Sequence, residues 1–251
     1  MRVSLTIFIV LHFSVLSFAK TDFSTPEYNK TAEIVNLRGY DITTGDIDKV
    51  MTYALMETDR IWESNIFGQI RHGLKNSEVK YSVTKYLMQH LADVFFHPNE
   101  LFSFKGQNFS ITQNTRSLAL ESFWDLAQAK LETKDVLDLL ERRMFDVTMM
   151  SMSDNKNEHV HAKNFLNKSL IYIQNNRHNR HLDLFALGVK NQLFNIFAAA
   201  ESAEIQSVAH KIITMIIKNG KNTNPVSLEF KATLVDISKT ISFQTCRNLW
   251  N

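Results

Sequence analysis

The spacing of the apolar residues constrains the fold of this chain more than any other feature. Between residues 44 and 217 they recur mainly at intervals of three and four, which places them on one face of an α-helix. Only 7 Gly and 3 Pro occur in the 251 residues, too few for the many turns of an all-β protein. We therefore predict an all-α fold.

The pattern predicts about eight helices, mostly antiparallel because short polar links join them. Thr44 is predicted to cap a first helix that runs to Ile66, and Pro98 to end a second that begins near Val79. The others are predicted at 118–131, 133–147, 160–173, 182–200, 205–217 and 226–243. The last of these also alternates like a strand, and we interpret it as a helix because its neighbours are helical.

Two arrangements of these helices remain open. One is a multi-helix bundle, and the other is a short stack of helical hairpins of the HEAT or armadillo kind, in which pairs repeat about every 40 to 47 residues. Segments 182–200 and 205–217 are apolar around much of their circumference. Such helices pack on several sides, so we expect these two at the centre of the core.

One stretch departs from the helical pattern. Phe102, Phe104 and Phe109 alternate with polar residues around Gly106, which is typical of a small hairpin or an extended loop. We predict a projecting loop at 101–112 with a two-stranded ribbon.

The first nineteen residues predict the compartment. Arg2 precedes the apolar run Val3–Leu16, and small residues follow at Ser17 and Ala19, the pattern of a cleaved signal peptide. An uncleaved anchor is the alternative, although a membrane span needs roughly 20 apolar residues. We expect a signal peptide at 1–19, an irregular segment at 20–43 and a single helical domain at 44–251, secreted and without stable membrane insertion.

Three sequons agree with secretion. They begin at Asn29, Asn108 and Asn167 and predict a glycoprotein. Asn167 is the weakest site, since it falls within a predicted helix.

Cys246 is the only cysteine, so an internal disulfide is excluded. Stability must come from the helical core. An unpaired cysteine is either buried as a small apolar residue or available to link two copies of the chain.

Charge argues against nucleic-acid binding. The chain carries 28 Lys and Arg against 26 Asp and Glu, interspersed along the sequence, whereas nucleic-acid-binding domains gather a basic excess on one face.

Four histidines are candidate metal ligands: His159, His161, His178 and His181. The two pairs stand at opposite ends of one predicted helix. A separation of 17 helical residues spans about 25 Å, so they could share an ion only if that helix were broken. We expect solvated polar termini, with no metal and no cofactor.

Catalytic motifs do not stand out. The nucleophile elbow, the phosphate-binding loop, the dinucleotide fingerprint and the zinc-protease pattern are all missing from the sequence, which favours a non-enzymatic function. We expect a secreted, glycosylated helical protein that binds another protein outside the cell. The predicted contact elements are the loop at 101–112, through Phe102, Phe104 and Phe109, and the polar segment 151–158.

A second interpretation is a carrier of a small apolar ligand. Bundle interiors hold such ligands, and a cavity could be lined by Phe123, Trp124, Phe185, Phe194 and Phe197. Plain core packing explains the same residues.

Overall fold

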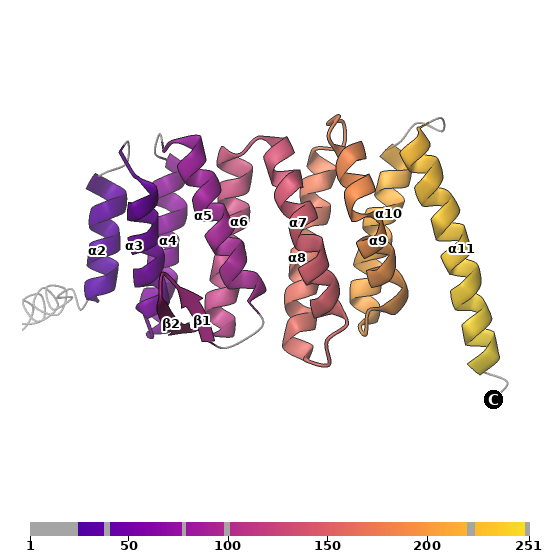
Figure 1. Cartoon of the computed structure of the whole chain (residues 1–251), viewed down its shortest axis with the longest axis horizontal. Coiled ribbons are helices and arrows are strands. Elements are labelled where there is room, and N and C mark those ends of the chain that lie inside the picture. The colour runs from indigo at the N-terminus through magenta and orange to yellow at the C-terminus, as the bar shows by residue number, and fades with distance from the viewer. Residues whose placement is uncertain (1–24, 38–40, 77–78, 98–100, 220–223, 249–251) are drawn as a thin grey trace, which may run out of the picture.

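The computed structural model describes residues 25–37, 41–76, 79–97, 101–219 and 224–248, and these form ten helices and two strands. The helices are α2 (Pro26–Leu37), α3 (Thr44–Met56), α4 (Arg60–Asn76), α5 (Tyr81–Phe96), α6 (Gln113–Lys130), α7 (Thr133–Ser151), α8 (Lys156–Asn175), α9 (Leu182–Ala199), α10 (Ala203–Asn219) and α11 (Pro225–Asn248); the strands are β1 (Leu101–Phe104) and β2 (Gln107–Ser110). The predicted all-α class is confirmed (Figure 1).

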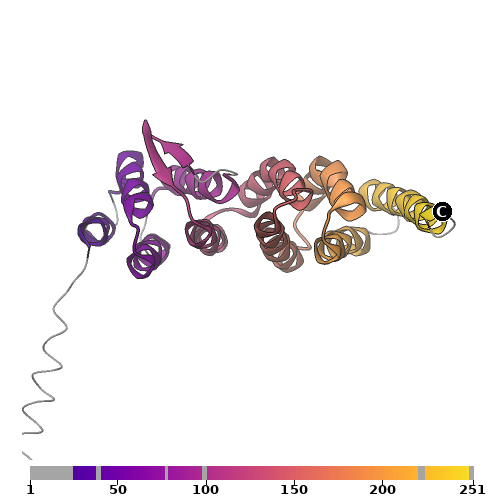
Figure 2. The ribbon, with the colours of Figure 1, turned by 90° about the horizontal axis from the view of Figure 1, so that it is seen from below.

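The helices form a row of hairpins in two layers. Figure 2 shows α3, α5, α7 and α9 in a first layer, continued by α11, and α4, α6, α8 and α10 in a second layer. Helix α2 packs on α3 and α4 at the N-terminal end of the row. The first-layer helices begin at residues 44, 81, 133, 182 and 225, at unequal intervals whose mean, about 45 residues, falls within the predicted repeat. The hairpin stack therefore describes the arrangement better than a bundle around one centre.

The predicted helix 44–66 is in fact two helices. Thr43, and not Thr44, is the N-cap of α3, and its side chain and that of Asp46 form a capping box. The helix ends at Met56, after which Glu57 Oε1 accepts the amides of Thr58 and Asp59. Asp59 Oδ1 then accepts two amides in the first turn of α4. These side-chain acceptors satisfy the backbone where the chain reverses.

Part of the segment expected to be irregular, 20–43, is helical. Helix α2 begins at Pro26, whose fixed φ suits a first helical turn, and Thr25 Oγ1 accepts the amide of Tyr28. Val35 is buried against α4, where Gly73 leaves space: a Cβ there would lie 1.8 Å from a Val35 methyl. Packing on α4, rather than its own weak apolar pattern, explains this helix.

Strands β1 and β2 form the predicted ribbon. They pair antiparallel, with Phe102 opposite Phe109. Lys105 and Gly106 form the two-residue turn, and both have positive φ (49° and 78°), as a type I′ hairpin turn requires. The ribbon projects from the outer side of the first layer, the side that points away from the second layer (Figure 2).

The core runs along the whole row, between the layers, and has no single centre. The largest fully buried side chains include Phe67 on α4, Phe95 on α5, Trp124 on α6 and Phe165 on α8. Helix α9 does not pack on all sides as expected: its Leu184 is 68% exposed. A first-layer helix has neighbours on both sides and beneath it, so its outer face stays open to solvent.

The aromatic residues expected around one internal cavity lie in two separate parts of the core. Trp124 packs edge-to-face on Phe123 and also contacts Phe165. Phe194 instead contacts Phe230 of α11, and Phe197 contacts His210 of α10. These contacts do not place the rings around one shared space, and they agree with the alternative of plain core packing.

The last predicted helix is confirmed as α11. Cys246 lies within it, but its side chain is outside the described part of the structure, as is the whole predicted signal peptide at 1–19. Among the described residues, no helix combines the length and the apolar character that a membrane span requires.

Candidate functional site

The ribbon is held against the first layer by its aromatic residues. Phe102, Phe104 and Phe109 are 8%, 5% and 7% exposed, so the expectation that they form an exposed contact surface is wrong. Phe104 packs edge-to-face on His90 of α5, and Phe102 on His97. Because strand residues alternate between faces, burial of these rings leaves Leu101, Ser103 and Asn108 exposed instead.

A polar network fixes the tip of the ribbon. The ammonium of Lys105 lies 3.0 Å from Asp48 Oδ2 of α3 and donates to the Tyr86 hydroxyl at 3.0 Å. Tyr86 in turn donates to Asp48 Oδ1 at 2.8 Å. The bonds to Tyr86 and Asp48 raise the pKa of Lys105, so the contact stays charged throughout the physiological range.

A cleft of about 470 Å³ lies between the ribbon, α5 and α7. His90 and Asp93 line it from α5, and Arg143 and Asp146 from α7. Burial lowers the pKa of His90 and keeps the ring neutral. Its ring nitrogens lie 3.8 Å from Asp48 and 3.9 Å from Asp93, beyond hydrogen-bond distance.

The carboxylates of this cleft already have partners. Asp93 bonds the guanidinium of Arg143, which also lies 3.4 Å from Asp146. Asp48 is bound by Tyr86 and Lys105. A general base must reach the proton that it removes, and these contacts engage the acids in joining α3, α5, α7 and the ribbon. The geometry therefore favours a structural role for these acids, which hold the ribbon and the neighbouring helices together, over a role in proton transfer.

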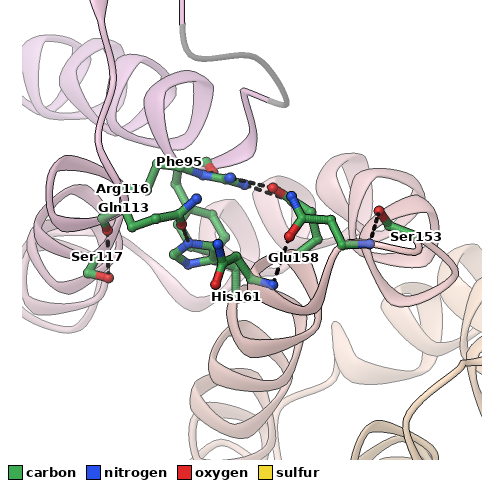
Figure 3. Close-up of polar contacts among 9 residues, drawn as sticks. Phe95, Gln113, Arg116, Ser117, Ser153, Glu158 and His161 are labelled. Atoms are coloured by element: carbon green, nitrogen blue, oxygen red, sulfur yellow. Dashed lines mark hydrogen bonds and ion pairs between the residues drawn. The ribbon is translucent and has the colours of Figure 1, made fainter.

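A second polar cluster joins α5 and α6 to α8, and so links the two halves of the row, α2–α6 and α7–α11 (Figure 3). Arg116 of α6 pairs with both carboxylate oxygens of Glu158 of α8, at 2.5 and 2.9 Å, and its Nε donates to the Phe95 carbonyl at 2.9 Å. The side chains of Arg116 and Glu158 are only 5% and 10% exposed. A bidentate pair satisfies both groups where water is excluded.

His161 completes this cluster. Its Nε2 bonds Oε1 of Gln113, and its ring packs edge-to-face on Phe95. Burial and the nearby guanidinium of Arg116 lower the pKa of His161 to about 4. The ring is therefore neutral at pH 7, and its buried Nδ1 has no hydrogen-bond partner among the described residues.

The four candidate metal ligands do not meet. His159 bonds the Ser153 carbonyl at 2.5 Å, near the start of α8, whereas His178 and His181 follow its C-terminal end. Among the described residues, no three His, Cys, Asp or Glu side chains gather closely enough to hold a metal ion. The helix that separates the two pairs is unbroken, so a shared metal site is ruled out for these four.

The polar segment 151–158 is mixed. Asp154, Asn155, Lys156 and Asn157 are exposed, but Ser151 and Glu158 are buried. Sequence reasoning missed the Arg116–Glu158 pair, since 42 residues separate its members. Glu158 has no sequence signal that distinguishes it from a solvated acid at a helix start.

Sequence reasoning also missed two exposed apolar pairs on neighbouring helices. Phe145 and Met149 of α7 are 62% and 57% exposed, and Leu184 and Leu187 of α9 are 68% and 45% exposed. Each pair is three or four residues apart and so shares one helix face. The helices are in contact, because Glu141 of α7 lies against Gly188 of α9. We call these four residues the apolar face.

The predicted sequons differ in exposure. Asn29 on α2 and Asn108 on β2 are exposed, whereas Asn167 on α8 is partly buried. Carrying a glycan is easiest at the first two, and the structure adds a reason to doubt the third.

Comparisons of this chain with protein-family models, with curated proteins and with solved structures found no match. Its function is therefore argued from its own residues.

Proposed function

We propose that this chain is a secreted, glycosylated, non-enzymatic protein that binds another extracellular protein on the outer face of its first layer. The observation that carries the proposal is the apolar face formed by Phe145, Met149, Leu184 and Leu187. Single exposed apolar residues are ordinary on soluble proteins, but groups of large ones mark interaction sites.

The second layer provides the contrast. Its large exposed apolar residues include Val160 and Ile171, which lie at opposite ends of α8, and Ile61 in the first turn of α4. These are scattered, whereas the apolar face consists of two pairs of such side chains on two touching helices. Phenylalanine and methionine are also favoured at interface centres.

The partner that fits this surface is a protein with an apolar segment of its own. On α9 the other exposed residues are Asp183, Gly188, Asn191, Asn195, Ala198 and Ala199, so one charged side chain, that of Asp183, lies beside Leu187. An amphipathic helix could lie across α7 and α9 with anchors at i, i+3, i+4 and i+7. Apolar anchors of the ligand would contact the four residues of the apolar face, and its polar residues would meet the charged neighbours Glu141 and Asp183.

The test begins with native mass spectrometry of the protein secreted by its own cells, which identifies a stoichiometric protein partner. The partner is then titrated against the variant Phe145→Ser/Leu184→Ser and against the control Val160→Ser/Ile171→Ser. The control removes two apolar residues of the second layer that are also more than half exposed. We expect the first variant to lose about 2 kcal/mol or more, about thirty-fold in Kd, as central anchors do, and the control to bind normally.

Three outcomes would contradict the proposal. They are equal loss of binding in both variants, unchanged binding in both, and a secreted protein that carries no macromolecule. A mass of two chains that the Phe145→Ser/Leu184→Ser variant abolishes would replace the foreign partner with a second copy.

A further inference from the structure

A second surface, at the turn between α8 and α9, has the chemistry of a binding site for small anions. Arg177, His178, Arg180 and His181 fall within five consecutive residues there. Each guanidinium donates through Nε to the ring of the next histidine, at 3.1 and 3.5 Å. Neither guanidinium forms an ion pair with another described residue, so their remaining donors are open to a ligand.

The turn that carries these cations is fixed by its own hydrogen bonds. Asn179 donates its amide to the Asn176 carbonyl at 2.9 Å, and its own carbonyl accepts the amide of Leu182 at 3.1 Å. Its side chain accepts the amide of His181 at 2.9 Å. Thr133 of α7 holds Asn176 from the neighbouring hairpin at 3.1 Å. Such preorganisation lowers the cost of binding.

Beside this turn lies a cleft of about 520 Å³, within the range of about 300 to 1,000 Å³ that small-molecule sites occupy. Arg177 and Arg180 line it. Its apolar lining comes from four helices, α8 to α11: Ile173, Leu182, Ile216 and Val226. These four side chains are 1 to 9% exposed, so they form a floor and not a projecting patch.

The lining has one carboxylate, and it does not cancel the cations. Asp183 accepts a hydrogen bond from Asn224 at 3.0 Å and is engaged with the start of α11. The two positive charges of Arg177 and Arg180 exceed the one negative charge of Asp183, so the described lining of the cleft has a net positive charge. A cationic rim above an apolar floor matches an anionic head on an apolar chain, since arginine binds carboxylates through two parallel hydrogen bonds.

We propose that this cleft binds a small amphiphilic carboxylate, such as a medium-chain fatty acid. Its head group contacts Arg177 and Arg180, and its chain covers Ile173, Leu182 and Val226. The site goes beyond the proposed protein-binding function and does not depend on it, because the cleft lies at the edge of the row and the apolar face on its outer side.

The test is isothermal titration of the full secreted chain with octanoate, with octylammonium and inorganic phosphate as comparison probes. The variant Arg177→Gln/Arg180→Gln removes the head-group contacts, and Arg60→Gln/Arg142→Gln removes two exposed arginines elsewhere, with the same change in net charge. We expect one octanoate to bind, about ten-fold more weakly in the first variant and unchanged in the control. Methyl shifts of Ile173, Leu182 and Val226 should accompany binding.

Several results would overturn this proposal. Absence of octanoate binding at millimolar concentration would do so, as would equal affinity for octylammonium, which removes the role of the cations. Phosphate that binds as tightly as octanoate would remove the role of the floor. Equal affinity in both double variants would place the ligand elsewhere. Circular dichroism confirms that each variant is folded.

Discussion

The outer face of the first layer differs between its two halves, α3 with α5 and α7 with α9. Over α3 and α5 the chain covers its own surface with the ribbon β1–β2, whose rings of Phe102, Phe104 and Phe109 are buried. Over α7 and α9 no described segment lies on the surface, and the apolar face remains in solvent. The same layer thus shows how the fold closes an apolar surface and where it leaves one open.

The difference extends to the charges. The covered half is tied together by Lys105, Tyr86 and Asp48 at the ribbon tip. The open half has the pair Lys190–Glu229, at 2.6 Å, between α9 and α11, beside the apolar face and not over it. The covered half is stabilised by contacts within the chain. The open half should gain further stability when a partner binds to it.

The largest expected effect concerns the buried ion pair between Arg116 and Glu158, which joins the two halves. Arg116→Ala leaves Glu158 buried without its cation, which should lower the free energy of unfolding by about 3 to 5 kcal/mol. Arg116→Met with Glu158→Leu should cost far less, because an apolar pair needs no partner charge. Urea denaturation measures both.

The control for the joint is Arg71→Ala, which breaks the more exposed pair between Arg71 and Glu121 and should cost about 1 kcal/mol or less. If Arg71→Ala and Arg116→Ala lower the free energy of unfolding equally, the buried pair contributes no more to stability than the exposed one.

The next effect separates the ribbon from the layer beneath it. Phe104→Ala removes a ring that is 5% exposed and packs on His90. Truncations of buried Phe cost about 3 kcal/mol or more. Amide hydrogen exchange should accelerate across residues 101–110, while exchange in α9 stays unchanged. Ser103→Ala, on the exposed face of the same strand, should leave amide exchange in the ribbon slow. Equal acceleration in that variant would contradict the conclusion that the buried rings hold the ribbon in place.

A pH effect of about 2 to 3 kcal/mol is expected at His161. Its pKa is about 4 in the folded chain and about 6.5 when unfolded, so between these values the unfolded chain binds the proton and the folded chain does not. Stability should therefore be complete above pH 6.5 and fall as the pH drops toward 4.

Urea denaturation at pH 7 and pH 4.5 measures this loss. His161→Gln should reduce it, and His210→Gln, at an exposed position of α10, should leave it intact. The lowered pKa of His90 contributes a smaller loss in the same direction in every variant. A His161→Gln protein with the full wild-type pH dependence would disprove the assignment to this ring.

The smallest effect is predicted for the open half. Leu184 is 68% exposed, so Leu184→Ser should change the free energy of unfolding by less than about 0.5 kcal/mol, in contrast to Phe104→Ala. A large loss of stability in the isolated chain would mean that Leu184 serves the fold and not a partner.

Sequence patterns predict the parts of this fold that depend on local chemistry. The spacing of apolar residues predicts most helices, and alternation of Phe102 and Phe104 beside Gly106 predicts the ribbon. Sequence patterns do not predict features that depend on packing between distant parts of the chain. Leu184 and Leu187 have the same periodic apolar context as their buried neighbours, and only the position of α9 in the row exposes them. The pairing of Arg116 with Glu158 likewise needs the second layer.

The claim that the open half is the docking surface is tested most directly by hydroxyl-radical footprinting of the chain alone and with its co-purifying protein partner. Met149, at 57% exposure, lies on the apolar face, and Met56, at 49%, ends α3 in the covered half. We predict that the partner lowers oxidation of Met149 and Phe145 several-fold and leaves Met56 unchanged. Protection of Met56 with Met149 still fully oxidised would contradict the proposed surface.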